Sequence, residues 1–388
     1  MAFMGRIIDR SSNMFLCAPK LKPHLHARLF KLSDGRHLVN AQRVEDQSCG
    51  NDCSTAAVSD SAIDQPCRPA PAMRRVALIY NPVSGQRSPI RTAIIEDALE
   101  VLRGAGIEAE AQETYASGSA GTQAREAISR GCDTILACGG DGTVHEILQC
   151  LVGTPVALGV LPLGTANALA ANLGLGSSPA KAIRMLLSAV PVRVSVGRIS
   201  YTDGEGVLRS RYFTVAAGVG ADAIFMSQLD PNLKRRFGYA LYMVVALRVW
   251  ATHSFPLFKA RFLDHDGTGE RVEELSQLFA VRIRDFGGIL QNLVPGATLH
   301  KDRLRLIAFK TRSRMQYLRF LLAIIFRRRA FSAKIELSDA AAVECRVPEG
   351  SAASIFVEAD GELLGALPVR IETVPEALTL LIPSHARP

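Results

Sequence analysis

Four short turns contain the residue types that could do chemistry in this chain. GGDGT (139–143), NPVSG (81–85) and PLGTANALA (162–170) each follow an apolar, strand-like run, and VEADGELLG (357–365) places two carboxylates after another such run. Glycines at the carboxyl end of a parallel strand let backbone N–H groups approach an anion closely, and a helix that begins there adds the positive end of its dipole. The three polar turns therefore predict a phosphate-binding edge of a sheet.

Asp141 is the carboxylate that stands among the glycines of GGDGT. A carboxylate does not fit beside a phosphate unless a divalent cation or a hydroxyl proton shares the site. The loop therefore indicates nucleotide phosphate together with Mg²⁺. The loop alone leaves a second interpretation open, in which Asp141 only caps the helix that follows.

The elements around these turns predict the fold. From Arg74 to about residue 190, strand-like runs alternate with helices that end at glycines, which is typical of a parallel sheet with helices on both faces. Beyond that point, strand-like runs separated by turn residues dominate, with two long helical segments between them. The prediction is an α/β plus β architecture: a three-layer, doubly wound parallel-sheet domain followed by a mostly antiparallel β-sandwich domain.

The chain is expected to divide into three parts. Residues 1–72 end in a stretch rich in Ser, Asp, Pro and Ala without lasting periodicity, which indicates an N-terminal extension or linker of low order. Residues 73–190 form the nucleotide-binding domain and residues 191–374 the β-sandwich domain. The last segment, 375–388, can return to the first domain.

Positive charge is concentrated in one segment. The formal net charge is +8, and residues 301–334 contain eleven Lys or Arg against one acid, Asp302. Such a segment suits the phosphates of nucleic acid or of an anionic membrane surface. No apolar run reaches the roughly 18 residues of a membrane span, and residues 1–20 do not read as a secretory signal. A cytoplasmic protein with reduced cysteines is therefore expected.

Taken in order, NPVSG, GGDGT, PLGTAN and DGE resemble the motifs of the diacylglycerol kinase catalytic family, which includes bacterial lipid kinases and the sphingosine and ceramide kinases. The resemblance runs from about Arg74 to Pro383. GGDG alone is shared with NAD kinases and phosphofructokinases, so the order and spacing of all four motifs make the likeness specific.

The resemblance implies transfer of the γ-phosphoryl group of ATP to a lipid hydroxyl, with the β-sandwich domain binding the lipid. Diacylglycerol is the first candidate, and a sphingoid base or ceramide stays open. The residues that the resemblance assigns to the nucleotide are Asn81, Pro82, Ser84, Gly85, Thr114, Gly139, Gly140, Asp141, Gly142, Thr143, Thr165 and Asn167. Asp141 would also hold Mg²⁺, although Asn167 could serve only to brace its loop.

The resemblance further implies that Asp360 or Glu362 takes the proton of the substrate hydroxyl. Asp360 is the favoured base because it comes first after the strand. Glu362 could instead form a salt bridge within the second domain.

One loop departs from the family pattern. Bacterial members carry an acidic LxDG loop that binds a structural Mg²⁺, but this chain has PGATLHKDRLRL, in which His300, Lys301, Asp302 and Arg303 replace the acidic positions and the Asp-Gly turn. No structural metal is therefore expected there.

Two other functions remain as alternatives: a soluble nucleotide kinase of the NAD kinase type, and a catalytically silent lipid or nucleotide binder. The expected partners are ATP, a lipid and an anionic membrane surface contacted peripherally by residues 301–334, with no nucleic acid, while a homodimer stays open. GVGADA (218–223) fits a dinucleotide pattern only weakly because no βαβ unit follows it. HEILQ (145–149) lacks the second His of a zinc helix, so His145 is assigned no role beyond a polar residue near the start of its helix.

Overall fold

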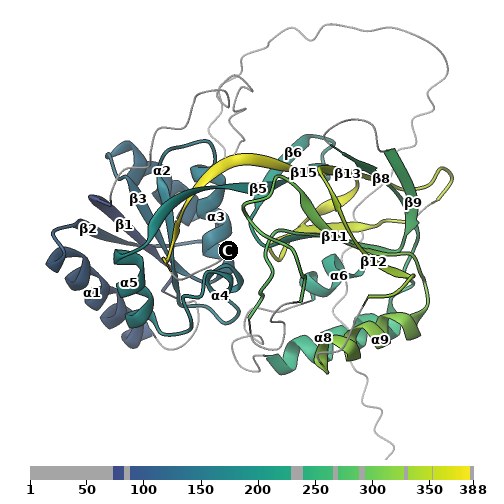
Figure 1. Ribbon diagram of the computed structural model, residues 1–388, viewed down its shortest axis with the longest axis horizontal. Coiled ribbons are helices and arrows are strands. Elements are labelled where there is room, and N and C mark those ends of the chain that lie inside the picture. Colours follow the sequence, from purple (N-terminus) through teal and green to yellow (C-terminus); the bar gives the residue numbers. More distant parts are fainter. Residues whose placement is uncertain are drawn as a thin grey trace, which may run out of the picture. The chain divides into compact units, whose positions relative to one another are not determined.

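The computed structural model describes residues 73–82, 88–228, 239–264, 270–287, 293–326, 331–351 and 353–384. The first half alternates strands and helices in the order β1 (Arg75–Tyr80), α1 (Ser88–Gly104), β2 (Glu108–Glu113), α2 (Ser119–Ser129), β3 (Thr134–Gly139), α3 (Asp141–Leu151), β4 (Ala157–Pro162), α4 (Ala168–Asn172) and α5 (Pro179–Leu187). The strands pair in parallel in the order β2-β1-β3-β4. Helices cover both faces of this sheet, with α1 beside α5 and α2 beside α3 (Figure 1).

Burial explains the sequence pattern of the central strands. Every residue of β3 and β4 is buried, and Val76–Ile79 of β1 is fully buried. A parallel sheet covered on both faces needs such continuous apolar runs. Strand β2, at the edge, buries only one residue and is correspondingly polar.

The second half is mainly antiparallel. Its elements are β5 (Val190–Thr202), β6 (Leu208–Phe213), β7 (Ala216–Val219), α6 (Ala221–Ser227), α8 (Tyr239–Thr252), β8 (Phe258–Leu263), β9 (Glu270–Leu275), β10 (Gln277–Val281), β11 (Leu304–Phe309), α9 (Arg314–Ile325), β12 (Ile335–Ala340), β13 (Ala342–Arg346), β14 (Phe356–Ala359) and β15 (Glu362–Ile382). A core of its own lies between the strands, formed by residues such as Phe213, Phe258 and Val357. The predicted fold class, a parallel α/β part followed by an antiparallel β part, is confirmed.

Strand β15 connects the two halves. It has 21 residues, pairs with β14 and β13 in its first part, and then runs antiparallel to β5 for most of its length. Near its end, Thr379 and Leu380 pair in parallel with β4 of the first half. Figure 1 shows β5 and β15 crossing together from one half to the other. We propose that the domains divide near residue 190 and that the segment from about residue 375 belongs to the first one.

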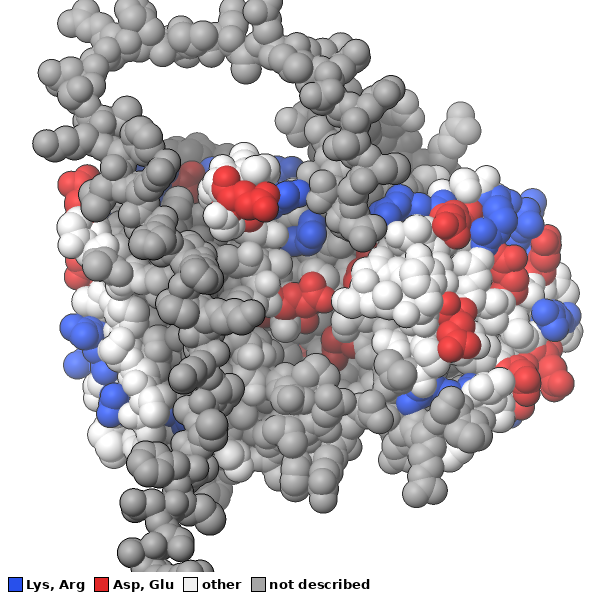
Figure 2. Space-filling model, turned by 180° about the vertical axis from the view of Figure 1, so that it is seen from behind, with Lys and Arg blue, Asp and Glu red and all other residues white. Residues whose placement is uncertain are grey.

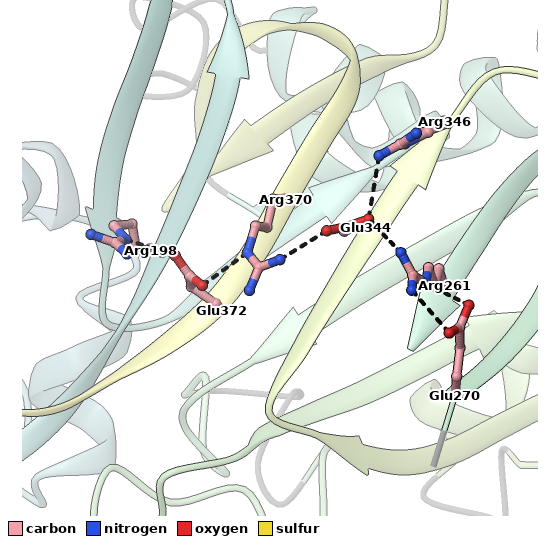
Figure 3. A network of polar contacts seen from close by, with 7 residues as sticks. All are labelled: Arg198, Arg261, Glu270, Glu344, Arg346, Arg370 and Glu372. Carbon is pink, nitrogen blue, oxygen red and sulfur yellow. Dashed lines mark hydrogen bonds and ion pairs between the residues drawn. The ribbon is translucent and has the colours of Figure 1, made fainter. Parts of the chain in front are cut away.

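A chain of ion pairs fixes the register of five strands in the second half (Figure 3). It contains Arg198 of β5, Glu372 and Arg370 of β15, Glu344 and Arg346 of β13, Arg261 of β8 and Glu270 of β9. Burial would raise the pKa of Glu372, but hydrogen bonds from Arg198 and Arg370 outweigh it and hold the pKa below its ordinary value. Cross-strand pairs of opposite charge stabilise one register over its neighbours, so the network helps to align β15 with its partners.

Candidate active site

The polar turns meet at one edge of the parallel sheet. The N–H of Asn81 donates to a β3 carbonyl at 3.3 Å, the N–H of Thr114 to a β1 carbonyl at 2.8 Å, and the N–H of Leu163 to the carbonyl of Gly139 at 2.9 Å. The backbone ladder thus continues past the carboxyl ends of β1, β2 and β4. This edge is where open α/β sheets place their ligands.

Two of these turns touch backbone to backbone, which only glycine allows. A Cβ on Gly164 would lie 2.5 Å from the Cα of Gly140 and 2.7 Å from Oδ1 of Asn167. A Cβ on Gly139 would lie 2.4 Å from Oγ1 of Thr143. Gly164 is therefore required by close packing of the PLGT loop on the GGDGT loop, and Gly139 by close packing within the GGDGT loop itself.

Asn167 braces the PLGT loop. Its Oδ1 accepts from the N–H of Gly164 and its Nδ2 donates to the carbonyl of Gly164, both at 2.9 Å. Asn167 also lies in the left-handed region with φ 49°, which asparagine tolerates better than most residues. These contacts support the bracing interpretation of Asn167 over direct contact with the nucleotide.

The start of α3 offers donors to an anion. The N–H groups of a helix's first turn have no partner within the helix, and Gly140 at the N-cap has no side chain to cap them. A Cβ on Gly142 would meet nothing within 4 Å, so this side of the loop is open. The edge therefore fits a nucleotide phosphate.

Asp141 is the first residue of α3 and ties two loops together, because its Oδ1 accepts from the N–H of Ala168 at 2.7 Å. A carboxylate has about four acceptor positions, so this hydrogen bond is compatible with a cation as well. Within the described ranges no group of three or more His, Cys, Asp or Glu side chains is arranged to hold a metal ion. Mg²⁺ usually takes one or two carboxylates together with substrate phosphates, and Asp141 fits that arrangement.

For the other predicted nucleotide-binding residues, the structure gives the burial and the position in the turns. Pro82 is half-buried in the turn after β1, Thr114 is buried after β2, and Thr165 is exposed in the PLGT loop. Ser84 and Gly85 lie outside the described residues.

The acidic motif forms a tight hairpin between β14 and β15. Ala359 pairs with Glu362, so the loop consists of Asp360 and Gly361, whose φ angles are 48° and 89°. Positive φ at both positions is the type I′ turn for which Asp-Gly is a preferred sequence. The Asp-Gly pair is thus a hairpin signal in the sequence as well as a source of a carboxylate.

The two carboxylates of the hairpin have different environments. Asp360 is 3% exposed in its side chain, and its oxygens accept the N–H groups of Thr214 (3.0 Å), Val215 (2.9 Å) and Ala216 (3.1 Å). The side chain of Glu362 is 46% exposed. Asp360 thus anchors the turn to the backbone before β7, while Glu362 is accessible to a ligand.

Two buried acids support the hairpin from behind. Oε2 of Glu358 accepts the N–H of Gly361 at 2.8 Å, and Asp222 hydrogen-bonds to Glu358 and accepts from Nε2 of Gln277. Burial, together with the neighbouring charge of Asp222, raises the pKa of Glu358. GVGADA thus serves the hairpin, because Asp222 packs beside the acid that holds the turn.

His145 joins α3 to the acidic hairpin. The residue is 2% exposed, with Nδ1 3.5 Å from Oδ2 of Asp360 and Nε2 3.6 Å from Oε2 of Glu362. Burial would lower the pKa of His145, but the hydrogen bond and charge of Asp360 and the charge of Glu362 raise it above its ordinary value, against the opposing charge of Arg211. The sequence alone assigns His145 no such role, because nothing local indicates a contact with residues more than 200 positions away.

Acidic side chains are also exposed near the middle of the face seen from behind, where the surface is hollowed (Figure 2). Exposed carboxylates in a hollow attract cations and metal-bound groups.

A buried arginine, which directly follows β10, holds the loop that departs from the family pattern. Arg282 is fully buried, and its guanidinium donates to the carbonyls of Arg303 (2.6 Å), Lys301 (2.9 Å), Ser195 (3.0 Å) and Leu299 (3.3 Å). Burial lowers the pKa of Arg282 to about 10. The guanidinium thus collects carbonyls that could otherwise face a cation, and the loop does not fit a metal ion.

Comparisons with known proteins identify relatives of both halves of the chain. Residues 75–199 match the family of the diacylglycerol kinase catalytic domain, and residues 214–382 match that of the YegS C-terminal NAD kinase beta sandwich-like domain. The chain therefore has an α/β domain of the diacylglycerol kinase catalytic type, followed by a β-sandwich-like domain of the YegS C-terminal type. It belongs to the diacylglycerol kinase catalytic-domain family.

Relatives extend over most of the chain. A diacylglycerol kinase of Mycobacterium tuberculosis (strain CDC 1551 / Oshkosh) is 28% identical over 316 residues, which are 80% of this chain and 96% of that protein. A diacylglycerol kinase of Bacillus subtilis (strain 168) is 24% identical over 81% of this chain and 98% of its own length. A crystal structure of a diacylglycerol kinase from Bacillus anthracis str. Sterne has the same fold, with a TM-score of 0.60, 20% identity and coverage of 80% of this chain and 97% of that one.

We expect Arg282→Met to destabilise the protein by about 3 kcal/mol or more, because several buried carbonyls lose their donors at once. Thermal or urea unfolding measures the change. Arg284→Met is the matched control, since Arg284 is exposed two residues away, and it should leave stability nearly unchanged. A chelator should not move the unfolding midpoint of the wild type. Equal stability of both variants, or a large loss of stability with chelator, would contradict the role given to Arg282.

Proposed function

We propose that the chain transfers the γ-phosphoryl group of ATP to a hydroxyl of a lipid, with diacylglycerol as the substrate. The observation that carries this proposal is the contact of α3 with the acidic hairpin through His145. Asp141 and His145 are four residues apart and therefore lie on one face of the helix, with Cβ atoms about 5–6 Å apart. The phosphate loop and the carboxylate of Glu362 thus face a common space.

In this proposal the N–H groups at the start of α3 bind the nucleotide phosphates, and Asp141 would hold Mg²⁺ on them. The metal would neutralise charge that develops on the transferred group. The chain's own contribution is to position the phosphates against the hydroxyl, which supplies most of the catalysis in phosphoryl transfer.

Glu362 is our choice for the residue that takes the hydroxyl proton. Its carboxylate is half-exposed, whereas the oxygens of Asp360 already accept three backbone N–H groups. Asp360, which the sequence favoured, instead supports the turn that carries Glu362.

A docking surface for the bilayer is formed by α8 and α9, which lie side by side (Figure 1). Nε1 of Trp250 in α8 donates to the carbonyl of Arg314 at 2.8 Å. Helix α9 is largely apolar yet buries none of its residues. Large apolar side chains are exposed on this docking surface: Val244 (64%), Leu247 (56%), Met315 (59%), Leu322 (41%) and Phe326 (67%).

The charges of the docking surface favour an anionic membrane. The charged residues in the two helices are Arg248, Arg314 and Arg319, all basic. Other basic residues of segment 301–334 are engaged with acids of the β-sandwich, since Lys310 pairs with Glu273 and Glu336. Three further arginines of the predicted membrane segment, Arg327, Arg328 and Arg329, lie outside the described residues. Among the described helices none is long and apolar enough to cross a membrane, so a surface contact is the form of binding that we propose.

We expect the purified protein to phosphorylate diacylglycerol in mixed micelles with labelled ATP and Mg²⁺, and to leave NAD unmodified. Asp141→Asn should lower turnover by about 10²- to 10³-fold with the fold intact, because the metal–phosphate assembly loses a charge. The assay should include sphingosine and ceramide in separate micelles. Phosphorylation of NAD, or unchanged turnover of the variant, would refute the proposal.

The two hairpin carboxylates should respond differently to substitution. Glu362→Gln should reduce kcat by about 10²- to 10⁴-fold at unchanged stability, the usual range for loss of a general base. Asp360→Asn should destabilise the fold by about 1–3 kcal/mol, because three backbone N–H groups face a weaker acceptor. Steady-state kinetics and thermal unfolding on both variants measure this split. If Asp360→Asn lost kcat at unchanged stability and Glu362→Gln stayed active, Asp360 would be the general base and Glu362 would not.

Membrane binding should depend on the apolar side chains of α9. Leu322→Ser with Phe326→Ser should weaken binding to vesicles of phosphatidylcholine and phosphatidylglycerol by about tenfold or more, since each buried side chain contributes about 1.5–3 kcal/mol. Leu208→Ser is the control, because Leu208 is 74% exposed in β6. Changing Arg248, Arg314 and Arg319 to Gln should remove most of the salt dependence, at about 1 kcal/mol per residue. Vesicle sedimentation that shows wild-type binding by all variants would exclude this surface.

A further inference from the structure

We propose that His145 is a positioning residue, which holds the carboxylate of Glu362 in place by bridging it to Asp360. The inference rests on the proposed function, in which Glu362 takes the hydroxyl proton. His145 faces both acids of the hairpin, and its effect on catalysis passes through Glu362.

One end of the bridge is rigid. Asp360 is fixed by the three backbone N–H groups that it accepts and by its place in the two-residue turn. Its Oδ2 lies 3.5 Å from Nδ1 of His145. This distance is long for a hydrogen bond, so charge accounts for much of the contact. His145 is buried in α3 and cannot move far, because a packed interior holds side chains in defined rotamers.

The other end of the bridge needs such a restraint. Glu362 is the first residue of β15 and its side chain is 46% exposed. An exposed glutamate has several accessible rotamers. If one rotamer is already held, less conformational entropy is lost when the substrate binds. Nε2 of His145, 3.6 Å from Oε2 of Glu362, provides the restraining charge.

The charged form of His145 is the one that can bridge. A neutral imidazole has a proton on one nitrogen only, so one of the two carboxylates would face a lone pair. In the imidazolium both nitrogens carry protons. The groups that face the ring are Asp360 and Glu362 from the hairpin and Arg211 from β6, and the two acids outweigh the arginine, so that the pKa of His145 is raised.

The sign of the pH dependence follows from that direction. A group whose pKa is raised in the folded state stabilises fully below its ordinary value, here 6.5, and loses this contribution as the pH rises through the folded value. The bridge is therefore complete at low pH and is lost at higher pH. In the wild type, kcat should fall as His145 loses its proton.

His145→Asn tests the proposal in the full-length chain. We expect kcat for diacylglycerol in mixed micelles to fall by about 10- to 100-fold, since small misplacement of a reacting group costs this much. KM for ATP should stay the same, and the fall of kcat at higher pH should be absent. His253→Asn is the matched control: His253 is a half-buried histidine that packs against Phe255, and its loss should change neither kcat nor the pH profile.

A second measurement does not depend on turnover. The imidazole of His145 is followed by NMR through the histidine range, about pH 5 to 8, in the wild type and in Glu362→Gln. The pKa of His145 should be lower in Glu362→Gln, because one of its two negative neighbours is gone. The NMR titration therefore tests the bridge between His145 and Glu362 even if His145→Asn fails to fold.

The inference is overturned by a wild-type kcat and pH profile in His145→Asn, or by an unchanged His145 titration in Glu362→Gln. Failure of the proposed function has a different signature, since the wild type would then not phosphorylate the lipid at all. In that case the NMR titration still reports whether the bridge exists.

Discussion

Helix α3 is the element on which the site depends, because its polar side chains fasten four other parts of the molecule. Asp141 holds the start of α4, His145 faces the acidic hairpin, Glu146 accepts the N–H groups of Gly118 (2.8 Å) and Ala120 (3.1 Å) at the start of α2, and Gln149 exchanges two hydrogen bonds of 2.9 Å with the backbone of β6. The hydrogen bonds of Asp141, Glu146 and Gln149 satisfy backbone polar groups that would otherwise be destabilising, whereas His145 meets its two acids through charge. A shift of α3 would therefore disturb the phosphate loop and the hairpin together.

The continuous sheet fixes the position of the acidic hairpin that faces α3. Strand β15 begins at the hairpin with Glu362 and ends beside β4, the strand that leads into the PLGT loop. One long strand thus connects the hairpin to the parallel sheet that carries the PLGT loop, and its register is held by β5 and by the ion pairs around Glu372. The acids behind the hairpin, Asp222 and Glu358, add a local support, and burial together with the charge of Asp222 raises the pKa of Glu358.

Local sequence patterns predicted most of the fold and only part of the site. Alternating strands and helices, glycine stops and apolar runs identified the parallel sheet, since each of these signals acts within a few residues. The contact of His145 with Glu362 spans 217 positions along the chain, and no local pattern encodes such a pairing. Asp360 shows the opposite case. Its Asp-Gly pair is a local turn signal, but the sequence also suggested Asp360 as the general base. Three backbone N–H groups donate to its carboxylate, so it is less suited to that role than Glu362.

Arg282 shows how a buried side chain can hold a loop from within. The loop 299–303 turns several carbonyls inward, and four carbonyl oxygens around one point need a positive charge or several donors. A guanidinium supplies both, with donors in a planar fork and a charge that remains at neutral pH even after burial lowers its pKa to about 10. Lysine and histidine at positions 301 and 300 are therefore compatible with this loop, because the guanidinium already supplies the positive charge that its carbonyls need. From the sequence, the basic residues of this loop indicated only that the acidic metal-binding pattern is absent. The structure shows that the Arg282 guanidinium binds the carbonyls of the same loop.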